Sequence, residues 1–587
     1  MSNKDTIAGI LHEIGVMLEM KGENRFKSLA YTHAARTLET LAEDLGELIR
    51  TGRLGELKGI GAALCEKITE LYETGKLQYY EELKASIPEG LFDCLKVPGL
   101  GPKKVKALWE KLDVKTLADL KMCCERNLVS TLAGFGEKTQ IKILEGLGNL
   151  EKYRGQFLWI EAWKAAEPVM DSLRDCPAVR RVELAGSLRR KKEVVRDLDF
   201  VAATDDPKIV MKVFTSLANV KQVVNQGETK ASVMLEGGLQ ADLRCVSDAE
   251  FPFALAYFTG SKEHNVALRQ RCLDQRMKLN EYGLFRIGKN RGEGSGEKVL
   301  CRSEADIYRK LGLDYVEPEL RENTGEIDAA AAGELPVLVT EKDIRGSFHA
   351  HTRWSDGSDT LEQMAEAAQA LGWEYLGITE HSRSSVVAGG LDAKRLLEQA
   401  DEIRELNKRW EGRGKRFRLF AGCEVDVLGD GRLDYPDDLL AQLDFVMVSI
   451  HQGFSSDEAR QTARLVKAIE NPMVTMVGHP TGRLLLEREQ YRVDLNAVIE
   501  AAARHGKIIE LNCTPVRMDM DWRWWKNARD RGVLCAINRD AHAADQLAEV
   551  GWGVQIARKG WLRAKDVLNT RTGGEVEKIL RRIRGTR

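Results

Sequence analysis

The sequence predicts a multidomain protein with an α-helical N-terminal region, an α+β middle region and a C-terminal parallel α/β barrel. Two observations predict this. The chain has 587 residues, whereas a single hydrophobic core stops growing at about 250–300 residues. The hydrophobic period also changes along the chain: helices joined by glycine turns before residue 150, strands between helices from 155 to 245, and regular strand–helix alternation after 340. That last rhythm is typical of a barrel.

The composition excludes a membrane protein and a polycation. The chain is 43% hydrophobic and 30% charged, with a net charge of −2, so any nucleic-acid binding must use local patches and backbone donors. No apolar run has the roughly 18 residues of a membrane span, and the first residues lack the features of a signal peptide. The eleven cysteines are dispersed without a CxxC pair, which predicts reduced thiols and a cytoplasmic protein.

Three turns in the N-terminal region share a Gly-hydrophobic-Gly form: Gly59-Ile60-Gly61, Gly99-Leu100-Gly101 and Gly134-Phe135-Gly136. Each precedes an amphipathic segment, and lysines such as Lys103, Lys104 and Lys138 lie nearby. Glycines bring bare backbone N–H groups to an anion, and the following helix adds partial positive charge. One such turn is more often a structural helix cap. Three of them indicate helix-hairpin-helix motifs, which hold the DNA backbone without reading its sequence.

This region resembles the lyase and fingers domains of family X DNA polymerases, which implies a lyase-like domain over 1–85 and a fingers-like domain over 86–150. By this resemblance Lys67 matches the Schiff-base lysine that removes a 5′-deoxyribose phosphate, and Lys27 and Tyr31 match groups around the 5′-phosphate pocket. The alternative for Lys67 is an ordinary surface lysine. Ala63 replaces the second pocket lysine of the family, which weakens the lyase expectation and leaves 5′-phosphate binding.

Carboxylates gather in the middle region. Asp197 and Asp199 stand at i and i+2 in a strand and therefore point to one face. Asp242, in a later strand segment, can join them. Three convergent carboxylates suit two Mg²⁺ or Mn²⁺ ions and phosphoryl transfer, with Ser187 and Arg190 beside Gly186 holding triphosphate oxygens. A lone DxD pair is common on protein surfaces. Together with Gly186-Ser187-Leu188-Arg189-Arg190 it resembles a nucleotidyltransferase palm, expected over 151–245.

The next segment matches the thumb of family X polymerases, expected over 246–318. The matching sequence runs from Tyr257 through Phe258, Gly260 and Asn265 to Arg269. The resemblance implies that Tyr257 and Phe258 contact the nucleotide sugar, that Asn265 contacts the incoming nucleotide, and that Arg269 lies on the template side. An aromatic core strand is the alternative for Tyr257-Phe258 alone.

Two residues depart from the family in the loop of the palm. Lys191 and Arg196 stand where the family usually has glycines. The second of these glycines approaches the triphosphate by its backbone, so polymerase efficiency is less firmly expected than polymerase ancestry.

Seven of the ten histidines follow residue 348, beyond a linker expected at 319–340. Several directly follow strand segments, where barrels keep their chemistry. Histidines mixed with carboxylates suit Zn²⁺, Mn²⁺ or iron. Over 341–587 they resemble the PHP domain, a distorted seven-stranded α/β barrel that holds up to three metal ions. Its ligand pattern is filled here by His349, His351, Asp356, His381, Glu424, His451, His479, Asp540 and His542.

Three further residues of this region bear on its expected hydrolysis. Arg383 and Arg517 are candidates for phosphate neutralisation, with a solvated arginine as the alternative for each. Ser347 replaces an aspartate of the family that is not a ligand, so hydrolysis is expected to survive.

The whole chain resembles bacterial-type DNA polymerase X. The resemblance implies a protein that fills gaps in base-excision repair with deoxynucleoside triphosphates, acting on gapped or nicked DNA with a 5′-phosphate, and the extended architecture indicates a monomer. It also implies 3′→5′ exonuclease activity and leaves abasic-site endonuclease activity open. Two alternatives remain: a repair nuclease whose polymerase half mainly positions DNA, and a non-catalytic scaffold that binds DNA ends.

Overall fold

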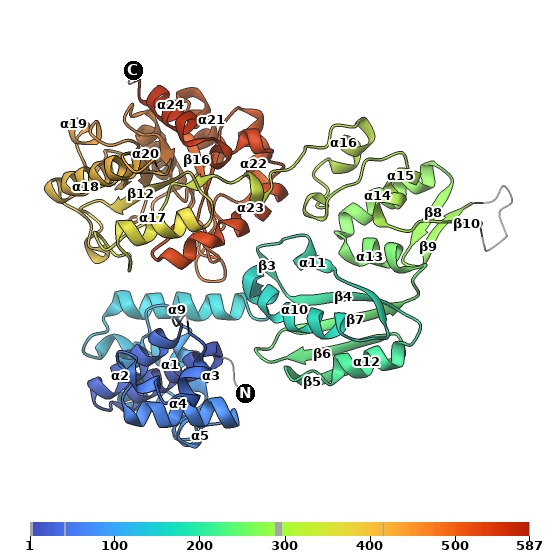
Figure 1. Cartoon of the computed structure of the whole chain (residues 1–587), viewed down its shortest axis with the longest axis horizontal. Coiled ribbons are helices and arrows are strands. Elements are labelled where there is room, and N and C mark those ends of the chain that lie inside the picture. Colours follow the sequence, from blue (N-terminus) through green and yellow to red (C-terminus); the bar gives the residue numbers. More distant parts are fainter. Residues whose placement is uncertain (1–3, 40, 42, 288–295, 415, 586–587) are drawn as a thin grey trace. The chain divides into compact units, whose positions relative to one another are not determined.

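The computed structural model describes residues 4–39, 41, 43–287, 296–414 and 416–585 (Figure 1). It divides into two compact units, Met1–Arg154 and Gly155–Arg587. The second unit contains the α+β region and the barrel.

The first unit is helical throughout its described residues. Its core is formed by apolar side chains such as Leu11, Ile14, Leu38, Ile68 and Leu108, each buried. The helices are α1 (Lys4–Lys21), α2 (Arg25–Glu39), α3 (Leu45–Arg50), η1 (Leu54–Glu56), α4 (Ala62–Thr74), α5 (Gln78–Ala85), α6 (Gly90–Leu95), α7 (Pro102–Leu112), α8 (Leu117–Glu125), η2 (Val129–Thr131) and α9 (Glu137–Lys152).

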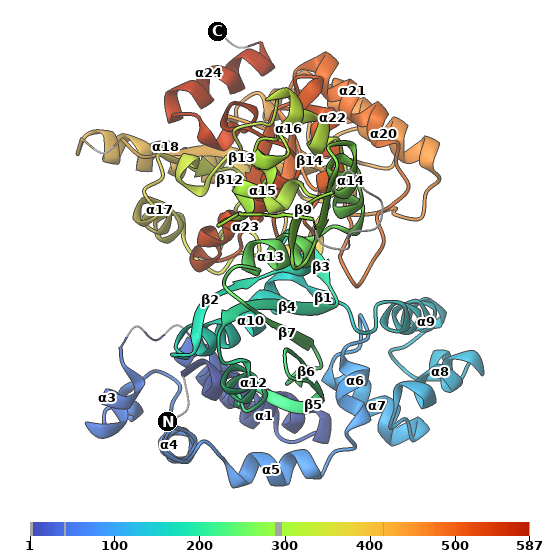
Figure 2. The ribbon, with the colours of Figure 1, turned by 90° about the vertical axis from the view of Figure 1, so that its right-hand side faces the viewer.

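The α+β region is built on a five-stranded mixed sheet of order β2-β4-β7-β6-β5 (Figure 2). The helices α10 (Trp159–Arg174) and α12 (Pro207–Thr215) pack against it and against each other. The short helix α11 (Gly186–Arg189) follows β2, and a small ribbon pairs β1 with β3. The strands are β1 (Phe157–Leu158), β2 (Val179–Leu184), β3 (Val194–Val195), β4 (Asp197–Thr204), β5 (Val220–Gln226), β6 (Lys230–Leu235) and β7 (Gln240–Val246).

The thumb segment follows as helices and a three-stranded sheet of order β10-β9-β8. Its elements are α13 (Phe251–Thr259), α14 (Lys262–Asp274), β8 (Met277–Asn280), β9 (Gly283–Arg286), β10 (Lys298–Val299) and α15 (Glu304–Lys310). Tyr257 and Phe258 therefore lie in a helix, so the alternative of an aromatic core strand is wrong. The residues from Phe251 to Ala256 are apolar throughout and buried, as expected of a helix covered on several sides.

The segment expected as a linker is folded. It forms η3 (Pro318–Leu320) and α16 (Glu326–Ala332), and Leu320, Ala330 and Leu338 belong to the hydrophobic cluster of the thumb. Arg321 is fully buried and donates to Glu304 at 2.6 Å. The alanine run that suggested a spacer is a short helix that packs against this cluster.

The C-terminal region is a parallel seven-stranded sheet of order β11-β12-β13-β14-β15-β16-β17. A bridge between Ala350 and Ala541 brings its two edges together, so the barrel is nearly closed. The strands are β11 (Gly346–Ser347), β12 (Tyr375–His381), β13 (Arg418–Asp426), β14 (Met447–Ser449), β15 (Met476–Val477), β16 (Ile508–Asn512) and β17 (Cys535–Asn538).

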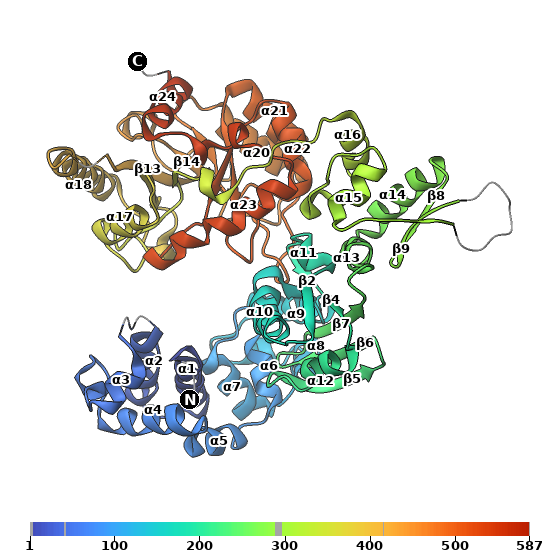
Figure 3. The ribbon, with the colours of Figure 1, turned by 45° about the vertical axis from the view of Figure 1, so that its right-hand side comes forward.

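Helices surround these strands (Figure 3). They are η4 (Glu341–Asp343), α17 (Leu361–Ala370), η5 (Val386–Ala388), α18 (Ala393–Glu411), α19 (Asp437–Leu440), α20 (Glu458–Glu470), α21 (Leu495–His505), α22 (Trp522–Asp530), η6 (Ala544–Glu549), α23 (Val550–Lys559), η7 (Ala564–Asp566), η8 (Leu568–Thr570) and α24 (Gly573–Arg584).

Candidate functional site

The candidate ligands of the barrel lie at the carboxyl ends of its strands. His381 is the last residue of β12, Glu424 lies in β13, and His451 and His479 each come two residues after a strand. Carboxyl ends of parallel strands meet at one end of a barrel. The structure accordingly brings together all nine residues that the sequence singled out.

Two carboxylates join the histidines at the centre. Asp540 Oδ1 lies 3.3 Å from His349 Nε2 and 3.2 Å from His351 Nε2. Glu424 Oε1 lies 3.3 Å from His451 Nε2 and 2.9 Å from His479 Nε2. Three groups have ligand atoms within 4.8 Å of one another: His351, Asp356, His381 and His542; His349, His351 and Asp540; and His381, Glu424 and His451.

The donor atoms at this site fit metal ions. Four buried histidines each have a ring nitrogen without a hydrogen-bond partner: His349, His351, His381 and His479. Oε2 of Glu424 is likewise buried and without a hydrogen-bond partner. A buried polar atom left unsatisfied costs about 1–3 kcal/mol, and one explanation is a ligand bound at that point. Imidazole and carboxylate are donors that Zn²⁺, Mn²⁺ and iron accept.

Protons and metal ions would compete for these donors. Burial lowers the pKa of His451, but Glu424 and Asp426 outweigh it and raise this pKa to about 10. Burial likewise opposes the rise at His542, whose pKa Asp356 and Asp540 bring to about 9. A histidine must be neutral to bind a metal, so binding at these residues releases protons.

Two carboxylates behind the ligands were missed by the sequence reasoning. Glu510 Oε1 lies 2.7 Å from His349 Nδ1, and Glu510 Oε2 accepts the backbone N–H of His479 at 2.6 Å. Asp426 Oδ1 lies 2.9 Å from His451 Nδ1. Such partners set the orientation and tautomer of a ligand histidine. An acidic residue inside the apolar strand β16 was the available signal for Glu510.

The other candidate residues of the barrel differ in how close they lie to the ligands. Arg517 lies at the edge of the cluster, with Nε 3.9 Å from Asp540 Oδ2. Arg383 is exposed and pairs with Asp434 at 3.2 Å. Ser347 is buried in β11, 3.3 Å from an oxygen of Asn538. Of the two arginines, Arg517 is the one placed beside the ligands.

The three aspartates of the palm lie on two adjacent strands. Strands β4 and β7 are parallel, with Asp199 directly opposite Asp242 in the register. Burial, together with the charges of Asp197 and Asp242, raises the pKa of Asp199 to about 7. Lys230 Nζ lies 3.2 Å from Asp242 Oδ2. Neighbouring carboxylates that resist ionisation favour a bound cation.

Gly186, Ser187 and Arg190 surround this triad. Gly186 has a φ of 62°, and a side chain there would collide with the carboxylate of Asp199, so glycine is required on both grounds. Ser187 and Arg190 line a cavity of about 470 Å³ that also reaches Asp197. The positive charge of Arg190 lowers the pKa of Asp199 and so partly offsets the rise caused by burial and the neighbouring aspartates.

The two departures from family glycines differ in their surroundings. Lys191 has a φ of 56°, a conformation that glycine adopts without strain. Its ammonium lies 4.3 Å from the ring centre of Trp163 and 4.8 Å from that of Trp159, and burial lowers its pKa to about 8. Arg196 instead is exposed and lines the cavity beside Asp197. Lys191 therefore packs on tryptophans, whereas Arg196 adds charge beside the triad.

The thumb residues form a connected group. Tyr257 packs edge-to-face on Phe258 with ring centres 5.2 Å apart. Asn265 donates to the backbone oxygen of Tyr257 at 2.7 Å, and Arg269 donates to that of Asn265 at 3.2 Å. Gly260, with a φ of 70°, ends α13. Hydrogen bonds thus link Tyr257 in α13 to Asn265 and Arg269 in α14.

The three glycine turns of the first unit share a left-handed first glycine, whereas among their second glycines only Gly136 has a positive φ. Their first glycines have φ values of 89° (Gly59), 83° (Gly99) and 86° (Gly134). Their second glycines, Gly61, Gly101 and Gly136, cap the N-termini of α4, α7 and α9 without a side-chain cap. Each turn therefore presents uncapped backbone N–H groups of the kind that bind phosphate.

The candidate lyase residues converge on a residue that the sequence reasoning missed. Lys67 Nζ lies 5.2 Å and Lys27 Nζ 5.9 Å from the ring centre of Tyr79, on which Tyr31 also stacks. Lys103 is exposed, with Glu19 at 3.9 Å. The structure thus places Lys27, Tyr31 and Lys67 around one ring, and nothing in the local sequence indicated Tyr79.

Family models match four stretches of the chain. A helix-hairpin-helix domain matches residues 2–77, a SAM-like helix-hairpin-helix tandem 93–149, the DNA polymerase beta thumb 254–322 and the PHP domain 347–514. Over 584 residues the chain is 39% identical to the DNA polymerase/3′-5′ exonuclease PolX of Bacillus subtilis, covering 99% of this chain and 100% of that protein. The chain belongs to the PolX family.

Other relatives match only part of the chain. A probable phosphatase of a Thermoanaerobacter species is 27% identical over 247 residues, which are 40% of this chain and 91% of that protein. A probable phosphatase of Caldicellulosiruptor bescii is 32% identical over 206 residues, 33% of this chain and 78% of that protein.

Membership of the PolX family, with helix-hairpin-helix and thumb domains, means that the chain binds DNA and depends on metal ions. None of the described helices is both long and apolar enough to cross a membrane.

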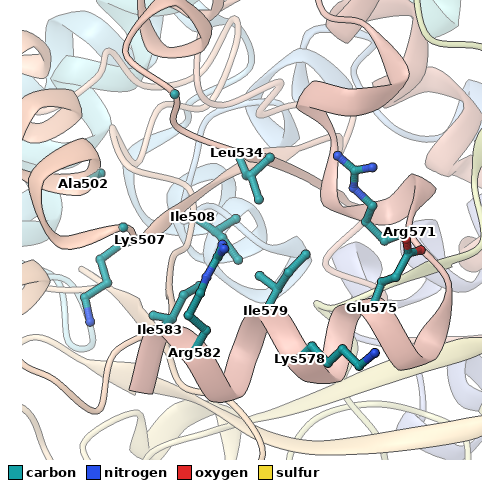
Figure 4. Close-up of a pocket in the computed structure, with 12 residues that line it drawn as sticks. Ala502, Lys507, Ile508, Leu534, Arg571, Glu575, Lys578, Ile579, Arg582 and Ile583 are labelled. Carbon is teal, nitrogen blue, oxygen red and sulfur yellow. The ribbon is translucent and has the colours of Figure 1, made fainter. Parts of the chain in front are cut away.

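A separate cavity of about 540 Å³ lies at the other end of the PolX barrel (Figure 4). Ile508 and Leu534, at the amino ends of β16 and β17, form part of its apolar wall, and α24 supplies Lys578 and Arg582. Lys507 beside it donates to the backbone oxygen of Val474 at 2.6 Å. Because the candidate metal ligands lie at the carboxyl ends of the strands, this cavity is not part of their site.

Proposed function

We propose that the chain is a DNA-directed DNA polymerase that fills short gaps in base-excision repair, and that its barrel is a 3′→5′ exonuclease. The observation that carries the proposal is the full-length likeness to a protein named for both activities. A palm with three aspartates and a barrel with nine candidate ligands support it. The domain limits we propose are 1–85, 86–150, 151–245, 246–318 and 341–587.

In the palm, Asp197, Asp199 and Asp242 would hold two Mg²⁺ or Mn²⁺ ions. Ser187 and Arg190 would donate hydrogen bonds to the triphosphate of the incoming deoxynucleotide. Tyr257 and Phe258 would contact its sugar, and Asn265 and Gly260 would complete its pocket. Arg269 would lie on the template side.

In the barrel, the nine ligands would hold up to three ions of Mn²⁺, Zn²⁺ or iron. Bound divalent ions supply an activated water and polarise a phosphodiester. Glu510 and Asp426 would hold His349 and His451 in the tautomers that binding requires. Arg517 would neutralise the phosphate of the DNA 3′ terminus, and the same site would cleave abasic DNA.

In the N-terminal unit, the three glycine turns would hold the DNA backbone, with Lys103 beside the second turn. Lys27 and Tyr31 would bind the 5′-phosphate of a gapped or nicked duplex, with Lys67 as the lyase nucleophile. Borohydride trapping on an incised abasic duplex tests this last assignment, because a Lys67→Ala variant that is trapped equally well contradicts it. We propose a monomer in the cytoplasm, and eleven free cysteines fit a reducing compartment.

A gapped, 5′-phosphorylated duplex with deoxynucleotides and Mn²⁺ tests the two activities together. We expect Asp199→Ala to abolish primer extension and leave 3′ trimming. We expect His349→Ala to abolish trimming and leave extension. If the wild type only trims, the second function, a repair nuclease whose polymerase half positions DNA, replaces the first; Arg196 beside Asp197 favours it. If neither variant changes anything on DNA, the chain is a DNA-end scaffold.

A further inference from the structure

Helix α23 of the barrel also contacts the palm and the thumb segment within the same compact unit. Trp552 packs against the hydrophobic cluster of the palm, and Trp561, just after the helix, belongs to that of the thumb. Arg558 donates to Glu319 at 2.8 Å. Helix α23 is therefore held by residues from both parts of the polymerase half.

Lys559, the last residue of α23, has no exposed side-chain surface. Its ammonium donates to Glu322 Oε1 at 2.7 Å, to the backbone oxygen of Arg190 at 2.9 Å and to that of Glu319 at 3.4 Å. All three N–H donors of the ammonium therefore have a partner. A charge this deeply buried is tolerated only when it is paired and hydrogen-bonded.

Arg190 meets the same carboxylate from the other side. Its Nε donates to Glu322 Oε1 at 3.0 Å, and Nη1 donates to the backbone oxygen of Thr259 at 2.5 Å. Arg190 and Glu322 are 11% and 9% exposed, so solvent screens this ion pair little. One oxygen of Glu322 thus accepts from two cations, one from the palm and one from the barrel.

We propose that Lys559 is a positioning residue for nucleotide binding: it shares the negative charge of Glu322 with Arg190, which leaves the guanidinium able to hold the triphosphate. This inference rests on the proposed role of Arg190 in the polymerase site. The PHP domain thereby supports deoxynucleotide binding in the palm, although none of its metal ligands takes part.

The reason is electrostatic. With Lys559 present, two positive charges face one carboxylate, so the group carries a net positive charge beside the cavity that Arg190 and Ser187 line. Without the ammonium, Glu322 and Arg190 form a neutral pair and the attraction for a polyanion falls. The carboxylate still has Arg190 as its partner, so no uncompensated buried charge remains.

Primer extension by the full-length protein on a gapped duplex, with the deoxynucleotide concentration varied, tests the proposal. Lys559→Met removes the charge and keeps an unbranched side chain only one atom shorter. We expect KM for the deoxynucleotide to rise about 10-fold or more, because one unit charge lost at about 12 Å from one phosphate charge has this effect at a dielectric constant near 20. We expect kcat to change less than about 3-fold, the pattern of lost substrate binding.

The double variant Lys559→Met/Glu322→Gln is the decisive rescue. Glutamine keeps an oxygen that can accept from Arg190 but brings no negative charge, so KM should return to within about 3-fold of the wild type. Lys565→Met, at an exposed position of the same domain, is the matched control and should leave KM unchanged. Unaltered 3′ trimming and an unaltered melting temperature show that the barrel is intact.

An unchanged KM in Lys559→Met, or a raised KM that the double variant does not restore, overturns the proposal. If Lys559→Met does not fold, Lys559→Gln, which keeps two N–H donors, takes its place with the same expected rise and the same rescue. Failure of the proposed polymerase site would look different, because extension by the wild type would then be insensitive to Asp199→Ala.

Discussion

Glu510 tests whether the barrel is a metal site whose ligands are held by partners behind them. Its carboxylate accepts from the backbone of His479 at 2.6 Å and from Asn538 at 3.0 Å, and it lies 2.7 Å from His349 Nδ1. Glu510→Gln keeps the shape but has only one accepting oxygen for these donors. The amide N–H groups of the glutamine would face another donor in a fully buried place.

The expected loss follows from these contacts. Loss of such a supporting partner typically costs about 10–100-fold in metal affinity or activity, equivalent to about 1.4–2.7 kcal/mol. We therefore predict that the Mn²⁺ concentration for half-maximal 3′ trimming rises by this factor in Glu510→Gln, whereas primer extension keeps its metal dependence. Glu500→Gln, on the exposed face of α21 and 65% exposed, is the control. An unchanged metal dependence of trimming, in a variant with normal stability, would refute this account of the site.

Three further predictions concern the polymerase half. Gly186→Ala should reduce primer extension at least about 10-fold at unchanged trimming, because its methyl group meets the carboxylate of Asp199 at a positive φ. The Mn²⁺ needed for extension should rise as the pH falls below 7, because burial and Asp197 raise the pKa of Asp199 to about 7 and the protonated carboxyl does not bind a cation; a flat dependence from pH 8 to 6 contradicts this. Burial raises the pKa of Glu304, but Arg321 and neighbouring groups outweigh it and lower this pKa to about 2. The stability that the ionised Glu304 contributes to the fold is therefore complete above the unfolded pKa of about 4.5 and is lost as the pH falls towards 2. Between pH 5 and 3 the loss of folding stability amounts to about 2 kcal/mol. Urea unfolding should therefore show a smaller loss of stability over this pH range in Glu304→Gln than in the wild type.

Local patterns sufficed for much of the fold and of both sites. The three glycine turns could be predicted because a positive φ followed by a helix start demands glycine at fixed positions. Asp199 and Asp242 could be predicted as neighbours because an i, i+2 pair has one face and parallel strands share an edge. The barrel strands form where the sequence pattern placed them, and the candidate ligands His381, His451 and His479 lie at or just after their carboxyl ends.

Contacts between residues distant in sequence could not be predicted. Glu510 lies beside His349, 161 positions away, and Tyr79 lies beside Lys27 and Tyr31, both more than 40 positions away. No local period reports such contacts. The segment 319–340 was expected as a linker because it holds an alanine run and Pro336, whereas Arg321 and Glu326 are buried there by partners in the thumb. From the sequence alone, Lys559 is indistinguishable from an ordinary lysine at the end of a helix.

The most direct test of two metal sites in one chain is a crystal structure of the protein grown with Mn²⁺ and examined by anomalous scattering. The account predicts strong peaks among His349, His351, Glu424 and Asp540, and a separate peak beside Asp199 and Asp242. It also predicts that the first set disappears in His349→Ala while the second remains. Mn²⁺ bound only at other positions, with both the barrel site and the aspartates of the palm free of metal at saturating Mn²⁺, would contradict it.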